Sequence, residues 1–399
     1  MAVTIEEHDA VFNPPAWLGS LELFAGAGGL ALGLQRAGFS PQAVVELDRR
    51  AVETLRVNGS TSGPAGVEWP VLQADVQTLS FEEFRGIDLI AAGPPCQPFS
   101  IGGHRRGRHD DRDLLPEALR AIREAKPKAF LIENVRGLTF PAASEYLNYT
   151  VAQLRTPSLT VDGLNEPSHI RRLREVPGAE REYRVVWRLI NAADYGVPQQ
   201  RVRLVIIGIR ADLREWSWPT VTHGRRALMK ALDGEAYWDR HGVTAAIRER
   251  NRVVTRATKG ALLTGTDNAQ VPWVTVRDMT RRLGEPGSEP ADPQHQLIPG
   301  ARLYKKHQGS LLDWPAKTVK AGVHGTPGGE HIVRLDDGSH RYFTVRECAV
   351  LQGFPTDYQL PSLRSVALRQ LGNAVPVDLA EALGRQLALL IRQPAEEEG

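Results

Sequence analysis

Short apolar runs alternate with helix-like stretches over the first third of the chain. The runs cover residues 21–24, 43–47, 71–74, 87–92 and 129–132. Each is followed by a glycine, an acid or a proline, as expected where strands end in loops. Helical spacing fills the intervals at residues 49–58, 81–85 and 115–124. Strands that alternate with helices in this way form right-handed βαβ units, so the pattern predicts an α/β fold with a doubly wound, mostly parallel sheet.

The rhythm changes after residue 141. Residues 142–154 have helical spacing, and residues 156–180 look like an irregular, polar insertion. The stretch 183–189 alternates, and 204–209 is a continuous apolar run, as in a buried strand. The α/β rhythm is lost from 211 to 340, which predicts a smaller, loop-rich second domain. Helical pattern returns at 345–352 and 374–392, so we assign residues 1–210 and 341–399 to one domain and 211–340 to the other.

Composition narrows the class of protein. A content of 42% hydrophobic and 24% charged residues is that of a globular chain rather than a disordered or membrane one. There is no apolar run of about 18 residues and no signal-like start, so a cytoplasmic location is expected. The two cysteines, Cys96 and Cys348, are too few for a disulfide framework or a Cys-rich zinc site, and no metal site is predicted. Cys348 lies in an apolar helical stretch and is expected to be a core thiol.

Charge is informative through its distribution. The net charge is only +2, but arginines are dense between Arg171 and Arg256. Such a stretch is typical of proteins that bind a polyanion. An ordinary solvated surface also explains such a run, and the charge run alone favours this second interpretation.

The first three predicted strands end in residues suited to an adenosine-containing ligand. Phe24 is followed by glycines at 26, 28 and 29, which allow close backbone approach and lead into a helix. Glu46 ends the second strand, where an acid can accept hydrogen bonds from ribose hydroxyls. Asp75 follows the third strand and could accept from an adenine amine. A nucleotide-phosphate loop is disfavoured because no Gly-Lys-Ser/Thr follows, and NAD is disfavoured because the third glycine is out of register.

The fourth and fifth strands end in reactive residue types. Cys96 lies in GPPCQPFS (93–100), where three prolines stiffen the turn and present the thiol instead of packing it. A free thiol has a pKa of about 8.5, so a nucleophilic role needs a neighbouring cation or helix terminus. Glu133 ends the fifth strand and is either solvated or tuned for proton transfer. Gln199-x-Arg201-x-Arg203 precedes a buried strand; from the residues alone, a site and an ordinary ion-paired strand edge are equally plausible.

Six motifs together resemble the C5-cytosine DNA methyltransferase family, nearly end to end. They are LFAGAGG (23–29), GPPCQPFS (93–100), ENV (133–135), QQRVR (199–203), RYFTVRECAVLQGFP (341–355) and LGNAVP (371–376). Their order and spacing match those of the family. The resemblance implies a Rossmann-like catalytic domain that uses S-adenosylmethionine, closed by the C-terminal helix, with residues 211–340 as a target-recognition domain.

The resemblance also implies roles for individual residues. Cys96 would attack C6 of a flipped cytosine, Glu133 would hold and protonate N3, and Arg203 would contact O2, with Arg201 in the same catalytic motif. The predicted cofactor-binding residues are Phe24, Gly26, Gly28, Gly29, Glu46, Asp75, Val76, Pro95, Asn373 and Ala374. The predicted DNA contacts are Ser100, Arg105, Arg106, Gln199 and Thr318. Of these, Ser100, Arg105 and Arg106 belong to a loop, 100–112, expected to close over the target, and Thr318 lies in WPAKTVKAG (314–322).

The expected partner is duplex DNA, with a cognate restriction endonuclease or other defence proteins as further partners, and the chain is expected to be a monomer. One alternative is a tRNA cytosine-5 methyltransferase. That branch carries an extra Cys-Phe-Thr element after the acid motif, whereas this chain has no cysteine between Cys96 and Cys348. A second alternative is a catalytically silent DNA-binding subunit, and a nicotinamide oxidoreductase is a distant third. The recognised DNA sequence cannot be read from residues 211–340.

Overall fold

A twisted seven-stranded sheet organises most of the protein. The structure is a computed structural model of the whole chain, and it describes residues 17–95, 113–160, 166–257, 271–289, 291–303, 308–321 and 331–393. The strand order is β3-β2-β1-β4-β5-β8-β6, and all neighbours are parallel except β8, which is antiparallel to β5 and β6. The strands are β1 Leu18–Leu23, β2 Phe39–Glu46, β3 Val71–Gln73, β4 Leu89–Ala92, β5 Ala129–Val135, β6 Tyr183–Asn191 and β8 Val202–Arg210. The predicted doubly wound, mostly parallel sheet is confirmed.

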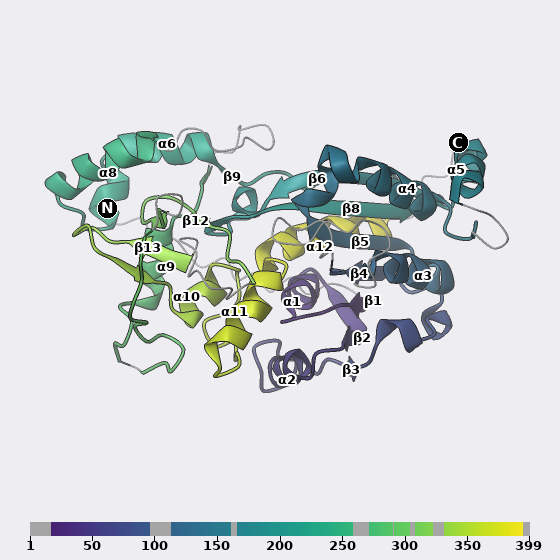
Figure 1. Cartoon of the computed structure of the whole chain (residues 1–399), viewed down its shortest axis with the longest axis horizontal. Coiled ribbons are helices and arrows are strands. Elements are labelled where there is room, and N and C mark those ends of the chain that lie inside the picture. The colour runs from purple at the N-terminus through teal and green to yellow at the C-terminus, as the bar shows by residue number, and fades with distance from the viewer. Residues whose placement is uncertain are drawn as a thin grey trace.

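Helices cover both faces of this sheet (Figure 1). The helices α3 (Leu115–Ala125) and α4 (Ser144–Arg155) pack on one face, and α1 (Gly29–Arg36) and α12 (Val377–Arg392) pack on the other. In α3 the buried residues Ala118, Ala121, Ile122 and Ala125 recur at helical spacing, which forms the apolar stripe that the sheet covers. The helix α2 (Arg49–Asn58) begins at Asp48, whose carboxylate accepts hydrogen bonds from the N–H groups of Arg50 and Ala51.

The two ends of the chain meet at α1. A Cβ atom built on Gly33 would lie only 2.4 Å from the carbonyl oxygen of Val377, so glycine is what allows α12 to pack this closely. The return of the C-terminal helix to the sheet, which the resemblance implied, is therefore present. The order of β1 between β2 and β4 also places the point where the strand order reverses beside the loop that precedes α1.

Residues 211–340 contain more helix than the sequence pattern predicted. Their helices are α6 (Arg225–Asp233), α7 (Ala236–Arg240), α8 (Ala245–Ala257) and α9 (Val276–Leu283), and their strands are the short β9 (His223–Gly224), β10 (Val271–Pro272), β11 (Ser310–Leu311), β12 (Ala316–Lys317) and β13 (Ile332–Arg334). In Figure 1 most of these elements lie on the left, with the large sheet on the right. Most described residues of this region still lie in loops, as predicted, but its helices were not predicted; in α8, arginines interrupt the apolar positions and hide the helical period.

A shared hydrophobic core joins the two parts of the chain. Val276 and Met279 of α9 belong to the same core cluster as Leu55 of α2 and residues of α10 (Val345–Val350) and α11 (Arg364–Asn373). Cys348 is fully buried in this core, and burial raises the pKa of its thiol, so the predicted core role is confirmed. The domain limits at 210 and 341 stay a prediction, since packing continues across them.

The insertion after α4 was also misread. It was predicted to be irregular, but it contains the helix α5 (Glu166–Glu175), which packs on α4 and lies at the right-hand end of the molecule in Figure 1. The buried His169 anchors this helix, because its Nδ1 lies 2.8 Å from the hydroxyl of Tyr149.

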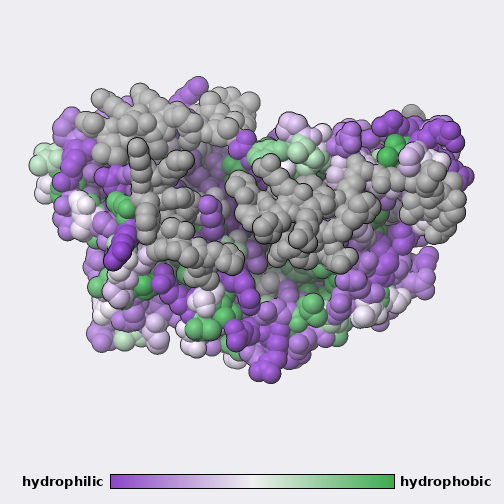
Figure 2. Space-filling view, viewed as in Figure 1, coloured by the Kyte–Doolittle hydropathy of each residue, from purple (hydrophilic) through white to green (hydrophobic). Residues whose placement is uncertain are grey.

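Outside the grey atoms, the face in Figure 2 is mostly hydrophilic, with small apolar areas. Among the residues that the structure describes, every helix is too short or too polar to span a bilayer.

Candidate active site

The cofactor side of the site is built where β1 and β2 end. Phe24 and Gly26 both have positive φ angles, 57° and 56°, which turn the chain sharply out of the sheet. The N–H of Gly26 donates to Oε2 of Glu46 at 2.8 Å, while Oε1 accepts from the N–H groups of Leu47 and Asp48. Three backbone donors therefore fix the Glu46 carboxylate at the sheet edge, next to the glycine turn. The structure brings these two predicted cofactor residues together.

The glycines of this turn have different neighbours. A Cβ on Gly26 would meet nothing within 4 Å, so the backbone there faces open space. A Cβ on Gly28 would come within 3.0 Å of Leu55, Tyr358 and Trp69, and one on Gly29 would lie 2.2 Å from the carbonyl oxygen of Val375. Packing against the protein therefore explains Gly28 and Gly29, and their contact with a cofactor stays a prediction.

The remaining predicted cofactor residues surround the same edge. Asp75 follows β3 and caps a short helical turn, in which Val76 is buried, by accepting from the N–H of Gln77. Pro95 is exposed just after β4, and Asn373 is exposed while Ala374 is buried at the junction of α11 and α12. Leu47, directly after Glu46, was not among the predicted cofactor residues and is a large apolar side chain that is 60% exposed at this edge.

The reactive side of the site is centred on Glu133. Its side chain is buried, 7% exposed, and Nε of Arg203 lies 3.0 Å from its Oε1 in an ion pair that lacks hydrogen-bond geometry. Within the described part of the chain, this Oε1 has no hydrogen-bond partner. Burial raises the pKa of Glu133, an effect that Arg203 and Arg201 only partly offset. Glu133 can therefore hold a proton to higher pH than an ordinary carboxyl group, and its Oε1 can still accept a hydrogen bond from a ligand.

The loop that leads to Cys96 lies beside Glu133. Nδ2 of Asn134 donates to the carbonyl oxygen of Pro94 at 3.3 Å, and a Cβ on Gly93 would be 4.0 Å from Oε2 of Glu133. These contacts place the start of GPPCQPFS against the end of β5. Four predicted site residues, Cys96, Ser100, Arg105 and Arg106, lie outside the described residues.

Arg201 is held by the protein itself. Its guanidinium is fully buried and donates to the carbonyl oxygens of Val319, Gly372 and Ala374 at 2.8–3.0 Å. The prediction that it acts in catalysis is corrected to a positioning role, because its hydrogen bonds tie the QQRVR segment to two distant backbone segments, at residue 319 and at residues 372–374. Burial lowers the pKa of Arg201, as expected for a cation without a hydrogen-bonded carboxylate.

Gln199 requires the same correction. It was predicted to contact DNA, but its side chain is fully buried, with Nε2 donating to the carbonyl oxygen of Leu351 and Oε1 accepting from the N–H of Val319. Thr318 is only half-buried, and its hydroxyl donates to the carbonyl oxygen of Gln200, where β12 pairs with β7 (Gln199–Gln200). The structure thus brings Thr318 next to the QQRVR segment.

Comparisons with known proteins relate the chain to DNA methyltransferases. The model of the family described as C-5 cytosine-specific DNA methylase matches residues 18–158 and 175–388, which leaves out most of the α5 insertion. Type II methyltransferase M.NgoMIV of Neisseria gonorrhoeae is 31% identical over 383 residues, 94% of this chain and 98% of that protein. Type II methyltransferase M.NaeI of Lentzea aerocolonigenes is 36% identical over 381 residues, 94% of this chain and 76% of that protein.

Solved structures show the same fold. The crystal structure of S. pombe Dnmt2 methyltransferase superposes with a TM-score of 0.58 at 18% identity, covering 94% of this chain and all of that one. A putative DNA modification methyltransferase from an E. coli prophage gives a TM-score of 0.51 at 22% identity over 94% of this chain and all of that one. At these identities the likeness concerns the fold alone.

Proposed function

Because the chain belongs to the C-5 cytosine-specific DNA methylase family, we propose that it methylates cytosine within a specific duplex sequence through a covalent Cys96 adduct. Transfer of a methyl group to DNA cytosine is the reaction of the family. What we propose is which residues of this chain perform the reaction, which methyl donor they use and which DNA they act on. The observation that carries it is the buried Glu133, paired with Arg203 and lying beside the loop that leads to Cys96.

The side chains divide the chemistry as follows. A cytosine inside a duplex is inaccessible, so it is flipped into the site at a cost of a few kcal/mol. The thiolate of Cys96 adds to C6, while Glu133 holds and protonates N3 and Arg203 contacts O2. Addition makes C5 electron-rich enough to take the methyl group. A base then removes the C5 proton and the bond between Cys96 and C6 breaks, which restores the thiolate.

The raised pKa of Glu133 supports its role as the acid. A carboxyl group with an ordinary pKa is ionised near neutral pH and has no proton to give. Burial keeps Glu133 protonated to higher pH, and its Oε1, which is ion-paired with Arg203 but accepts no hydrogen bond in the described chain, leaves capacity for the substrate ring.

The sheet edge suits S-adenosylmethionine, which supplies an electrophilic methyl group on its sulfonium. The open space in front of Gly26 leaves room for a ligand to approach the backbone. Oε2 of Glu46 accepts one backbone hydrogen bond and retains a lone pair for a ribose hydroxyl. Asp75, Val76, Pro95, Asn373 and Ala374 border the same region as further candidate contacts.

We assign target recognition to residues 211–340, with Thr318 near the flipped nucleotide. The similarity to proteins named Type II methyltransferases supports a place in a restriction–modification system, with a cognate endonuclease as partner. The alternative substrate, tRNA, lacks a supporting feature, since the chain has no cysteine between Cys96 and Cys348.

Bisulfite sequencing of DNA from cells that express the protein tests this function. We expect one short sequence to hold a protected cytosine, and Cys96→Ser to lose this protection while still binding S-adenosylmethionine in a titration. Protection that survives in Cys96→Ser would contradict the nucleophile. Methylated tRNA with unmodified DNA would instead support the alternative substrate.

A further inference from the structure

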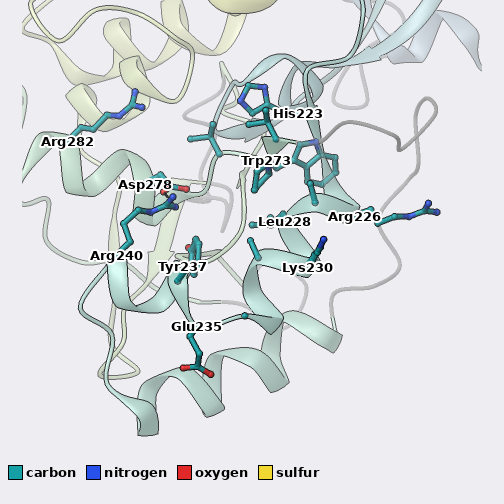
Figure 3. Close-up of a pocket in the computed structure, with 17 residues that line it drawn as sticks. His223, Arg226, Leu228, Lys230, Glu235, Tyr237, Arg240, Trp273, Asp278 and Arg282 are labelled. Atoms are coloured by element: carbon teal, nitrogen blue, oxygen red, sulfur yellow. Dashed lines mark hydrogen bonds and ion pairs between the residues drawn. The ribbon is translucent and has the colours of Figure 1, made fainter. Parts of the chain in front are cut away.

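A large hollow opens in the part of the chain assigned to target recognition (Figure 3). Its volume is about 1150 Å³, and it lies between α6, α7, β10 and α9. Leu228 and the buried Trp273 contribute apolar surface to it. Its charged lining consists of four cations, Arg226, Lys230, Arg240 and Arg282, and two acids, Glu235 and Asp278. We refer to this cavity as the basic hollow.

Both acids of the basic hollow already have partners. Glu235 forms an ion pair with Arg248, and Asp278 accepts a hydrogen bond from Arg240 at 2.7 Å. Burial opposes ionisation of Asp278, but hydrogen bonds with His241 and Thr275 outweigh it and lower its pKa to about 2. Burial also lowers the pKa of His223 on the rim, so this histidine is neutral near neutral pH. The excess positive charge therefore comes from lysine and arginine.

Three of the cations are exposed, and they come from two helices. Arg226 and Lys230 lie on α6, and Arg282 lies on α9. Figure 3 shows their side chains on different sides of the opening. A concave surface that presents exposed cations from several sides suits an extended anion, and these charges act together on a polyanion.

A short series of contacts connects the basic hollow to the segment near the target. The ring of Trp273 packs edge-on against Trp314 at 5.8 Å between centroids. Nε1 of Trp314 donates to the side chain of Gln200, whose backbone carbonyl accepts from the hydroxyl of Thr318. The hollow is thus packed onto the same framework as Thr318.

We propose that the basic hollow binds the phosphate backbone of duplex DNA on the flank of the target base. This inference rests on the proposed function, because it needs duplex DNA as the substrate. The arginine-rich stretch between Arg171 and Arg256 then contributes to two separate surfaces, of which the basic hollow is one. The other surface, α5, lies at the opposite end of the molecule, where Arg171 already pairs with Glu175.

The salt dependence of DNA binding tests the proposal. A triple variant, Arg226→Gln, Lys230→Gln and Arg282→Gln, removes the exposed charges of the hollow. Arg240 is kept because its ion pair with Asp278 supports the local structure. The matched control removes three exposed arginines of α5 through Arg171→Gln, Arg172→Gln and Arg174→Gln. Affinity for a fluorescent duplex of mixed sequence is measured across a range of salt concentrations.

The hollow variant should lose about 2.7 units from the slope of log affinity against log salt, since each phosphate contact contributes about 0.9. Its affinity then falls about 40-fold less than that of the wild type between about 50 and 200 mM salt. The α5 control should keep the wild-type slope. The single variant Lys230→Gln, which should lose about 0.9 units, keeps the test decisive if the triple variant does not fold.

An unchanged slope in the hollow variants would overturn the proposal. An equal loss in the α5 control would also overturn it, because the effect would then reflect total charge. Failure of the proposed function is distinguishable from either result: it would appear as absence of DNA methylation by the wild type, whereas binding to mixed-sequence DNA requires no methyl transfer.

Discussion

Two buried clusters of arginine and carboxylate are satisfied to very different degrees. In the recognition region, Arg277 donates four hydrogen bonds of 2.5–3.0 Å to Asp313 and Asp336. At the candidate active site, Glu133 and Arg203 form one ion pair, and Oε1 of Glu133 has no hydrogen-bond partner among the described residues. Both clusters consist of arginine and carboxylate groups. They differ in how many of the possible hydrogen bonds of these groups are made within the protein.

The pKa shifts follow this difference. Burial disfavours the charged form of Arg277, but hydrogen bonds to Asp336 and Asp313 outweigh it and raise its pKa. At Glu133 burial prevails over the cations, and the pKa of the carboxyl group is raised. The first cluster is stable in its charged form, whereas the second is held in an incompletely satisfied state that a substrate can complete. Such sites are expected where chemistry occurs.

The largest expected effect is that of Glu133→Gln on turnover. The amide keeps the shape of the side chain but cannot donate a proton to N3, so kcat should fall by about 10²- to 10⁴-fold. The wild-type rate should decline as pH rises through the raised pKa of Glu133, and the variant should lack this decline. Steady-state kinetics across pH measure both. A variant with wild-type kcat would show that incomplete pairing at Glu133 has no catalytic meaning.

Arg277→Met should have its main effect on stability. Removing the guanidinium leaves the buried Asp313 and the half-buried Asp336 without their cation, which costs up to about 3–5 kcal/mol. Arg49→Met is the control, because Arg49 pairs with Glu53 on the exposed surface of α2 and its loss should cost at most about 0.5 kcal/mol. Urea unfolding compares the two. Equal midpoints for both variants would contradict a structural role for the Arg277 cluster.

The smallest expected effect concerns Glu22, a third buried acid, in β1. Its Oε1 accepts from the hydroxyl of Ser20, its Oε2 has no partner in the described chain, and burial raises its pKa to about 8. Because the folded-state pKa lies above the ordinary value, stability is greatest at low pH and is lost as pH rises through about 8. The slope reaches about 1.4 kcal/mol per pH unit.

Glu22→Gln should remove this slope. Relative to the wild type, the variant should gain up to about 2 kcal/mol between about pH 6 and pH 8, as measured by urea unfolding at each pH. Its kcat should match that of the wild type, because Glu22 lies inside the sheet and outside the site. A loss of turnover in Glu22→Gln would show that the comparison between clusters must include this residue.

The sequence predicted the sheet well because its signals are local. Apolar runs ending in glycine, acid or proline located β1 to β5, and the motifs marked the strand ends that form the candidate site. The helices α5 and α8 were missed because their polar, arginine-rich sequences hide the helical period, and tertiary packing through His169 stabilises the first.

The sequence by itself determined which residue types stand at the strand ends, and therefore the chemistry available there. Only the tertiary structure separated Arg201 from Arg203. A strand pattern places both on one face, but the chain passes at Arg201 from β7, which pairs with β12, to β8, which pairs with β5 and β6. Arg201 consequently meets carbonyl oxygens of residues 319, 372 and 374, while Arg203 meets Glu133. Contacts between residues so distant along the chain leave no local signal, because they depend on how whole elements pack together.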